Sequence, residues 1–330
     1  MNEGLVCGFA IRPGPDGSSE VRSLAAPTEA ARPGEWIWLH FDRSEPGTEA
    51  WLRRESHLSD TLVDALLDGE TRPRHALLDD GALVILRGIN LNPGAAAHDM
   101  LSVRIFVSDD LVVTVRRAPI FAVRDIRERY EAACTQGGRH VPETPTHLLG
   151  AIVEGMTDRI SETVAELEDA LDALEERVDD EEPEALRDDS LRLRRRALPL
   201  KRFLAPQREA LTAFSKARVH FMQDDTRVLI AEEAERTVRL VEALDALRER
   251  AGLLQEEIAG DIADRLNRNT YSLTVVAAIF LPLGFLTGLL GINVGGMPGA
   301  DTPWAFWAVV ALCVALSVAG VWAMRRWRLL

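Results

Sequence analysis

The chain has 330 residues, of which 47% are hydrophobic and 27% charged, and its formal net charge is −14. That length is enough for two domains, and the acidic balance argues against a nucleic-acid partner, which would require a basic face. The three cysteines are widely spaced and include no CxxC pair, which argues against a disulfide framework. The seven histidines are scattered without HxxxH spacing, so no tight metal site is identified.

The first 140 residues are predicted to form a cytoplasmic α/β domain. They contain no basic stretch followed by an apolar stretch near the start, so no signal peptide is predicted. Apolar runs and alternation predict strands over residues 4–12, 36–41, 83–89, 101–107 and 111–116. Helical periodicity predicts helices over residues 51–67 and 122–133. No phosphate loop, nucleophile motif or metal triad is visible here, so the domain is not predicted to be an enzyme.

Residues 145–270 are predicted to form long cytoplasmic helices. In the first helix, apolar residues three or four apart make a coiled-coil-like seam, namely Val153, Met156, Ile160, Val164, Leu167, Leu171, Leu174 and Val178. Acidic residues crowd its remaining surface, which is either a solvated face or an electrostatic trap for cations. The second helix, residues 184–214, has an arginine run from Arg192 that either pairs with the acidic helix or faces lipid head groups. Pro199 and Pro206 are expected to kink it.

The third helix is predicted to begin near Arg218 or Asp225 and to continue without a break into an apolar segment. The sequence has no proline in this stretch before Pro282. Such a helix is about 110 Å long, and copies of it in an oligomer would form a stalk.

Two charge-free segments, residues 271–290 and 304–324, are each long enough to span a membrane. Basic residues precede the first segment and form the tail at residues 325–330, whereas the loop 291–303 has no Lys or Arg. Basic residues favour the cytoplasmic side, so both termini are expected in the cytoplasm and the loop outside. A receptor with two spans is a distant alternative, because 13 residues are too few for a sensory domain between them.

Two helices cannot enclose a pore, so a transporter of this design must assemble from several copies around an axis. Gly284 and Gly288 have the GxxxG spacing that permits close helix approach; they serve either helix packing or the space of a pore. Gly291, Ile292 and Asn293 follow at the helix end, where backbone carbonyls carry partial negative charge. In a ring of copies, these carbonyls and the Asn293 amide oxygen would form neutral oxygen girdles suited to a hydrated divalent cation.

In these features the sequence resembles the CorA superfamily of metal-ion transporters, whose members carry Gly-Met-Asn after the first of two C-terminal spans. The Gly-Ile-Asn form followed by Val294–Gly299 is similar to the zinc-transporter branch of that superfamily, ZntB. The resemblance covers the whole chain. It implies a CorA-like fold: an α/β cytoplasmic funnel domain plus long coiled-coil-like stalk helices and two C-terminal transmembrane helices. It also implies a homopentamer in the lipid bilayer of the bacterial inner membrane.

The resemblance assigns roles to individual positions. It implies ion entry and selection at Gly291, Ile292 and Asn293. It implies a pore lined by Asn267, Leu273, Leu281 and Gly284. Asp301 is the only acidic residue of the outer loop and is expected to attract cations, since Gly299 stands where magnesium-type members often have Glu.

The expected cargo is zinc, with proton coupling as part of the hypothesis and no bound cofactor. Transport of magnesium, cobalt or nickel by the same architecture is the alternative.

Overall fold

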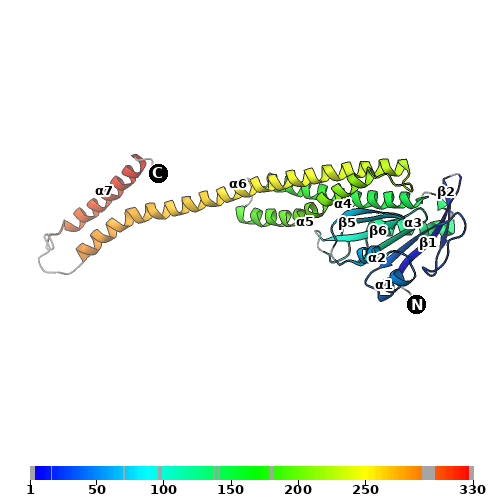
Figure 1. Cartoon of the computed structure of the whole chain (residues 1–330). Helices are drawn as coiled ribbons and strands as arrows, with labels where there is room; N and C mark the ends of the chain where they lie inside the picture. The colour runs from blue at the N-terminus through cyan, green and yellow to red at the C-terminus, as the bar shows by residue number, and fades with distance from the viewer. Residues whose placement is uncertain are drawn as a thin grey trace. The chain divides into compact units, whose positions relative to one another are not determined.

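The computed structural model describes residues 4–15, 17–69, 71–95, 99–136, 138–139, 141–178, 182–291 and 302–326 (Figure 1). The chain divides into two compact units, Met1–Gln255 and Glu256–Leu330. The first unit contains a β-sheet and the helices packed on it. The second contains the C-terminal part of one long helix, and a shorter apolar helix.

In the described residues of the first unit, an eight-stranded sheet has the order β4-β5-β6-β7-β3-β1-β2-β8. Its strands are β1 (Leu5–Pro13), β2 (Ser18–Ser23), β3 (Trp36–Asp42), β4 (Arg74–Leu78), β5 (Gly81–Ile89), β6 (Met100–Val107), β7 (Leu111–Arg116) and β8 (Gly138–Arg139). The central pair β3 and β7 is parallel, and the other paired strands are antiparallel. The five strands predicted from alternation are confirmed as β1, β3, β5, β6 and β7.

The two faces of the sheet bury two separate apolar cores. Helices α3 (Phe121–Gln136) and α4 (Pro145–Glu176) cover one face, where Phe9, Trp38 and Tyr130 pack together. The ring centroids of Phe9 and Tyr130 are 5.4 Å apart. Helices α1 (Pro46–Arg54) and α2 (Asp60–Leu67) cover the other face, where Phe41 stacks on Trp51 at 4.9 Å.

The single helix predicted over residues 51–67 is wrong, because α1 and α2 are separate. The chain leaves the helix after Arg54, and His57 takes a left-handed conformation with φ 57°. Ser59 then begins α2, and its side chain accepts a hydrogen bond from the Leu62 amide. Serine is a preferred N-cap residue. Ser59 therefore marks the start of a second helix, although the apolar spacing alone predicts one continuous helix here.

Three long helices complete the first unit: α4, α5 (Pro183–Ser215) and the N-terminal part of α6 (Asp224–Gly291). The predicted seam of α4 is confirmed, since its apolar residues from Val153 to Leu174 are buried. Pro199 and Pro206 both lie inside α5. The third predicted helix is confirmed as continuous from Asp224 to Gly291.

Ion pairs join these helices at their edges. Arg236 of α6 contacts Asp158 of α4 at 2.7 Å, and Arg250 contacts Asp172 at 2.5 Å. Of the arginine run on α5, Arg196 lies 3.9 Å from Glu166. The acidic surface of α4 is therefore partly neutralised, by α6 more closely than by α5. Each pair is solvent-exposed and contributes at most about 1 kcal/mol.

A buried polar network joins the parallel strands β3 and β7. His40 is paired in register with Thr114, and its Nδ1 lies 2.7 Å from the Thr114 hydroxyl. Arg116 Nε donates to His40 Nε2 at 3.0 Å. The His40 proton therefore sits on Nδ1 and is donated to Thr114. Burial, reinforced by the charges of Arg116 and Arg127, lowers the pKa of His40 from 6.5 to about 3.

His40 is predicted to stay neutral in the folded protein throughout the physiological pH range. In the unfolded chain it takes up a proton near pH 6.5, so its contribution to stability is present above pH 6.5 and is lost as the pH falls towards 3. The exchange rate of its imidazole C2 proton with deuterium, followed by mass spectrometry, should show no inflection between pH 5 and 8. The urea-unfolded chain is the control. An inflection near pH 6.5 in the folded protein would contradict the network.

Candidate functional site

The C-terminal helices of the second unit are apolar and unburied. An 18-residue stretch of α6 has a mean hydropathy of 2.0, a matching stretch of α7 (Ala305–Arg326) has 2.2, and no residue of either stretch is buried. A helix in the core of a soluble protein passes the same hydropathy test but is mostly buried. Exposed apolar helices of this length fit a bilayer, whose hydrocarbon core is about 30 Å thick.

The structure places five of the predicted site residues on α6. Asn267, Leu273, Leu281, Gly284 and Gly291 are all exposed, and Leu273 and Leu281 have 74% and 71% of their surface accessible. Gly291 is the last residue of the helix. The other three predicted residues, Ile292, Asn293 and Asp301, lie outside the described residues.

One row of α6 is partly shielded, and it lies away from the predicted pore residues. Val275, Ile279 and Leu283 are each of intermediate exposure, as are Ala305, Val309, Cys313 and Ser317 at four-residue spacing on α7. Because α7 is the other described helix of this unit, we infer that α7 shields that row of α6. With about 100° per residue, the five pore candidates are centred about 160° around the helix from the shielded row.

The same face contains residues that the sequence analysis missed. Thr270, Ala277 and Gly288 point in the same direction as Leu281 and Gly284 by the same helical geometry of about 100° per residue. The signal was present, because residues 270, 277, 284 and 291 are spaced by seven. These four residues are all small and uncharged. Their side chains therefore occupy little volume on this face and carry no charge.

The glycines of this face are not needed for packing within one chain. A Cβ atom built on Gly284, Gly288 or Gly291 would meet no atom of the described chain within 4 Å. Helix packing inside one copy therefore does not explain the GxxxG spacing. The space beside these glycines is open to another copy, to lipid or to a pore.

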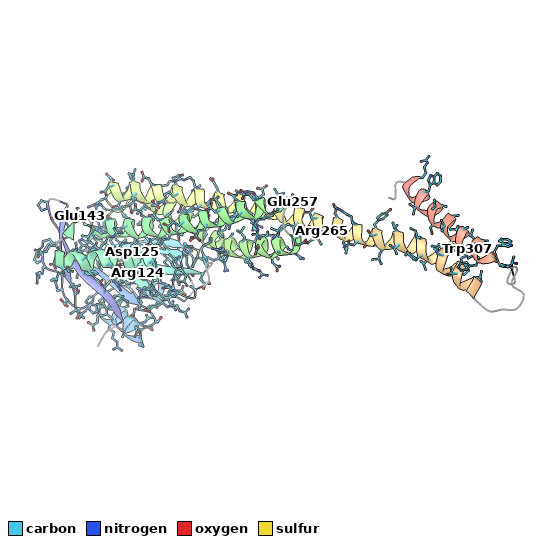
Figure 2. The ribbon with its side chains drawn as sticks, turned by 180° about the vertical axis from the view of Figure 1, so that it is seen from behind. Arg124, Asp125, Glu143, Glu257, Arg265 and Trp307 are labelled. Atoms are coloured by element: carbon cyan, nitrogen blue, oxygen red, sulfur yellow. The ribbon has the colours of Figure 1, made fainter. Side chains whose placement is uncertain are left out.

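Charged residues at the N-terminal end of this segment avoid the face. Asp261, Arg265 and Arg268 lie more than about 120° around the helix from its centre. Figure 2 labels Arg265 on α6 and Trp307 on α7. Trp307 is 69% exposed, as expected for an aromatic residue near a membrane interface. Among the described residues, no group of three or more His, Cys, Asp or Glu side chains is placed to hold a metal ion.

Comparisons with known proteins agree with this architecture. A family model described as "CorA-like Mg2+ transporter protein" matches residues 33–326. The chain is 39% identical to the "Divalent cation transporter CmaX" of Pseudomonas aeruginosa, over 98% of this chain and 96% of that protein. It is 32% identical to the "Zinc transport protein ZntB" of Yersinia enterocolitica, over 94% of this chain and 92% of that protein.

The fold has a close counterpart among solved structures. The structure of the full-length CmaX protein is similar, with a TM-score of 0.83 and 36% identity over 99% of both chains. These matches confirm the family resemblance and the fold class predicted from the sequence.

The two faces of α6 are predicted to differ in access to water. We expect Leu281→Cys to react with a membrane-impermeant thiol reagent about tenfold faster than Leu283→Cys, because only an exposed thiolate in water is reactive. Both variants are made in a chain whose own cysteines are replaced, and labelling is measured by mass spectrometry in nanodiscs. Equal rates at the two positions would contradict the assignment of faces.

Proposed function

This chain belongs to the CorA-like Mg2+ transporter family, and we propose that zinc is its physiological cargo, carried along the axis of a homopentamer. Transport of divalent cations across a membrane is the activity of the family. The observation that carries the proposal is the neutral face of α6, which is apolar and unburied, and on whose glycines a Cβ atom would meet no atom of the described chain within 4 Å.

Assembly around an axis follows from this face. One copy supplies one candidate pore-lining helix, and the shielded row leaves the opposite side of α6 uncovered. Several copies placed with that side inward enclose a path lined by Asn267, Leu273, Leu281 and Gly284. The glycines then give either close helix contact or room for a hydrated ion.

Ion selection is proposed at the C-terminal end of α6. Gly291 ends the helix, and the helix-end carbonyls carry partial negative charge. Ile292 and Asn293 follow directly in sequence, so their backbone carbonyls and the Asn293 amide oxygen are proposed to complete the ring. Asp301 is proposed to attract cations to the entrance.

Zinc is favoured over magnesium by two observations. The relative from Yersinia enterocolitica is named a zinc transport protein, and the Gly-Ile-Asn motif resembles that branch. Transport of magnesium, cobalt or nickel is the second candidate, supported by the family's description and by the broader name of the relative that is 39% identical.

Proton coupling is proposed to run through water in the pore. Residues 271–290 contain no Asp, Glu, His, Lys or Arg, so this span has no carboxylate or imidazole relay of the usual kind. The protein is proposed to reside in the bacterial inner membrane with both termini cytoplasmic. Arg265 and Arg268 precede the first span and the outer loop has no Lys or Arg, which supports this orientation.

Zinc flux into proteoliposomes tests the proposal. We expect zinc uptake that rises with an inward proton gradient and is unaffected by excess magnesium. Empty liposomes and a clamped membrane potential are the controls. Magnesium flux driven by potential alone would instead support the second candidate, and no metal flux under any gradient would remove the transport proposal.

Asn293→Ala is predicted to lower this flux by about 10-fold or more, because it removes the amide oxygen that accepts hydrogen bonds from the water bound to the ion, and hydrogen bonds of this charge-assisted kind contribute on the order of 1.5–3 kcal/mol each. The oligomer should remain intact by size-exclusion chromatography with light scattering. Asn269→Ala, on α6 before the span, is the matched control and should transport normally. Wild-type flux in Asn293→Ala would exclude this residue from ion selection.

A further inference from the structure

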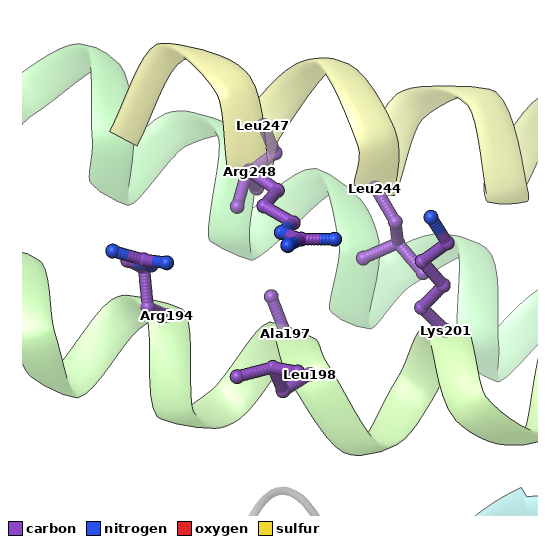
Figure 3. A pocket seen from close by; sticks show the side chains of 7 residues that line it. All are labelled: Arg194, Ala197, Leu198, Lys201, Leu244, Leu247 and Arg248. Atoms are coloured by element: carbon purple, nitrogen blue, oxygen red, sulfur yellow. The ribbon is translucent and has the colours of Figure 1, made fainter. Parts of the chain in front are cut away.

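A small groove with basic walls lies between α5 and α6 in the first unit (Figure 3). Arg194, Lys201 and Arg248 line it, together with the apolar side chains of Ala197 and Leu198. Its volume is about 30 Å³, whereas pockets for small molecules measure roughly 300–1,000 Å³. The groove is therefore too small for a free ligand of that kind.

In a single copy, the groove keeps one exposed apolar side chain and one arginine without a partner among the described residues. Leu198 leaves 58% of its surface exposed, and among the described residues Arg248 has no hydrogen-bond or ion-pair partner. Lys201 is paired with Asp245, and Arg194 donates to the Gln255 side chain at 2.5 Å. An apolar centre with a positively charged rim is the usual anatomy of a protein–protein contact.

A complementary surface lies on another flank of α6. Glu235, Glu242 and Glu249 are spaced by seven residues, are all exposed, and have no ion-pair partner in the part of the chain that the structure describes. Leu253 is four residues after Glu249, on the same flank, and is 62% exposed. We call these four residues the acidic flank.

The angle between the two surfaces suits a closed ring. Arg248 points about 125° around the helix from the centre of the acidic flank. In a ring built by repeating one head-to-tail contact, each subunit meets two neighbours through two different surfaces, about 108° apart for five copies. The acidic flank of one copy can thus meet the groove of the next in every contact of the ring.

We propose that the acidic flank of one copy docks into the α5–α6 groove of a second copy. Leu253 packs on Leu198, and the glutamates pair with Arg248 and Arg194. This interface rests on the proposed assembly around an axis, and it identifies the surfaces that set the register between neighbours. The contact uses opposite charges, so it also disfavours the alternative of two like flanks meeting.

Cross-linking between two tagged copies tests the contact directly. One copy carries Leu198→Cys, the other Leu253→Cys, and both lack Cys7, Cys134 and Cys313. Co-expressed full-length chains should give a covalent dimer containing both tags under mild oxidation in membranes. Replacing Leu253→Cys by Ala231→Cys, which lies about 33 Å away along the same helix, should give less than about a tenth of the product.

Charge reversal gives an independent readout. Glu242→Lys with Glu249→Lys, or Arg194→Glu with Arg248→Glu, should raise the concentration at which the oligomer dissociates by about tenfold or more. Combining all four should restore it, which a mere folding defect would not do. Glu232→Lys, exposed on α6 outside the acidic flank, is the control for added positive charge.

Each outcome separates this interface from the proposed function. An intact oligomer without the mixed cross-link and without an effect of charge reversal overturns the interface and leaves transport standing. A wild-type chain that is monomeric in nanodiscs overturns the assembly itself. If Arg194→Glu with Arg248→Glu leaves the oligomer intact but abolishes binding to vesicles of anionic lipid, the groove is a lipid site and the proposal is wrong.

Discussion

Helix α6 has more apolar surface than one chain can cover, and the rest of the structure depends on how that surface is buried. In the first unit, Leu240, Leu244 and Leu247 are buried within the helical layer. In the second unit, Leu273 and Leu281 remain exposed. A bilayer removes such side chains from water, and an unbroken helix keeps nearly all backbone groups hydrogen-bonded within hydrocarbon. The requirement for a membrane therefore follows from the residues themselves.

Charged side chains have different roles in the two units. In the first unit, Arg236 and Arg250 form ion pairs with carboxylates of the acidic helix α4. Those carboxylates therefore help to hold α4 and α6 together. In the second unit, the charged residues near Asn267 are turned away from the neutral face. A cation on that face would meet oxygen dipoles and small apolar groups. Such weak binding is compatible with conduction, because an ion held tightly would not leave.

Sequence patterns predicted the parts of this chain that are rich in buried apolar residues. The inner strands were predicted because burial on both faces makes them apolar along most of their length, and the seam of α4 was predicted because one face of that helix is buried in a regular repeat. Strands β2 and β4 were missed, because they are short and largely polar or exposed. The α1–α2 break was missed because Ser59 marks a helix start that apolar spacing does not report. Of the site, Leu281 was assigned by resemblance and Gly284 by resemblance and its GxxxG spacing, whereas Thr270 was missed although it lies at seven-residue spacing before Ala277 and Gly284 in the sequence.

Gly284 and Gly288, inside α6, lower the stability of that helix. A glycine inside a helix costs about 1 kcal/mol of helix stability relative to alanine. In the described part of one chain, no atom lies within 4 Å of where the Cβ of either residue would be, so no packing contact offsets that cost. The span in one isolated chain is therefore less stable as a helix than the same span with alanine at these positions. The contacts that offset this loss of stability come from outside the chain. By mass action, the stability of this segment then depends on the protein's density in the bilayer. Dilution in lipid would loosen the helix as well as separate the copies.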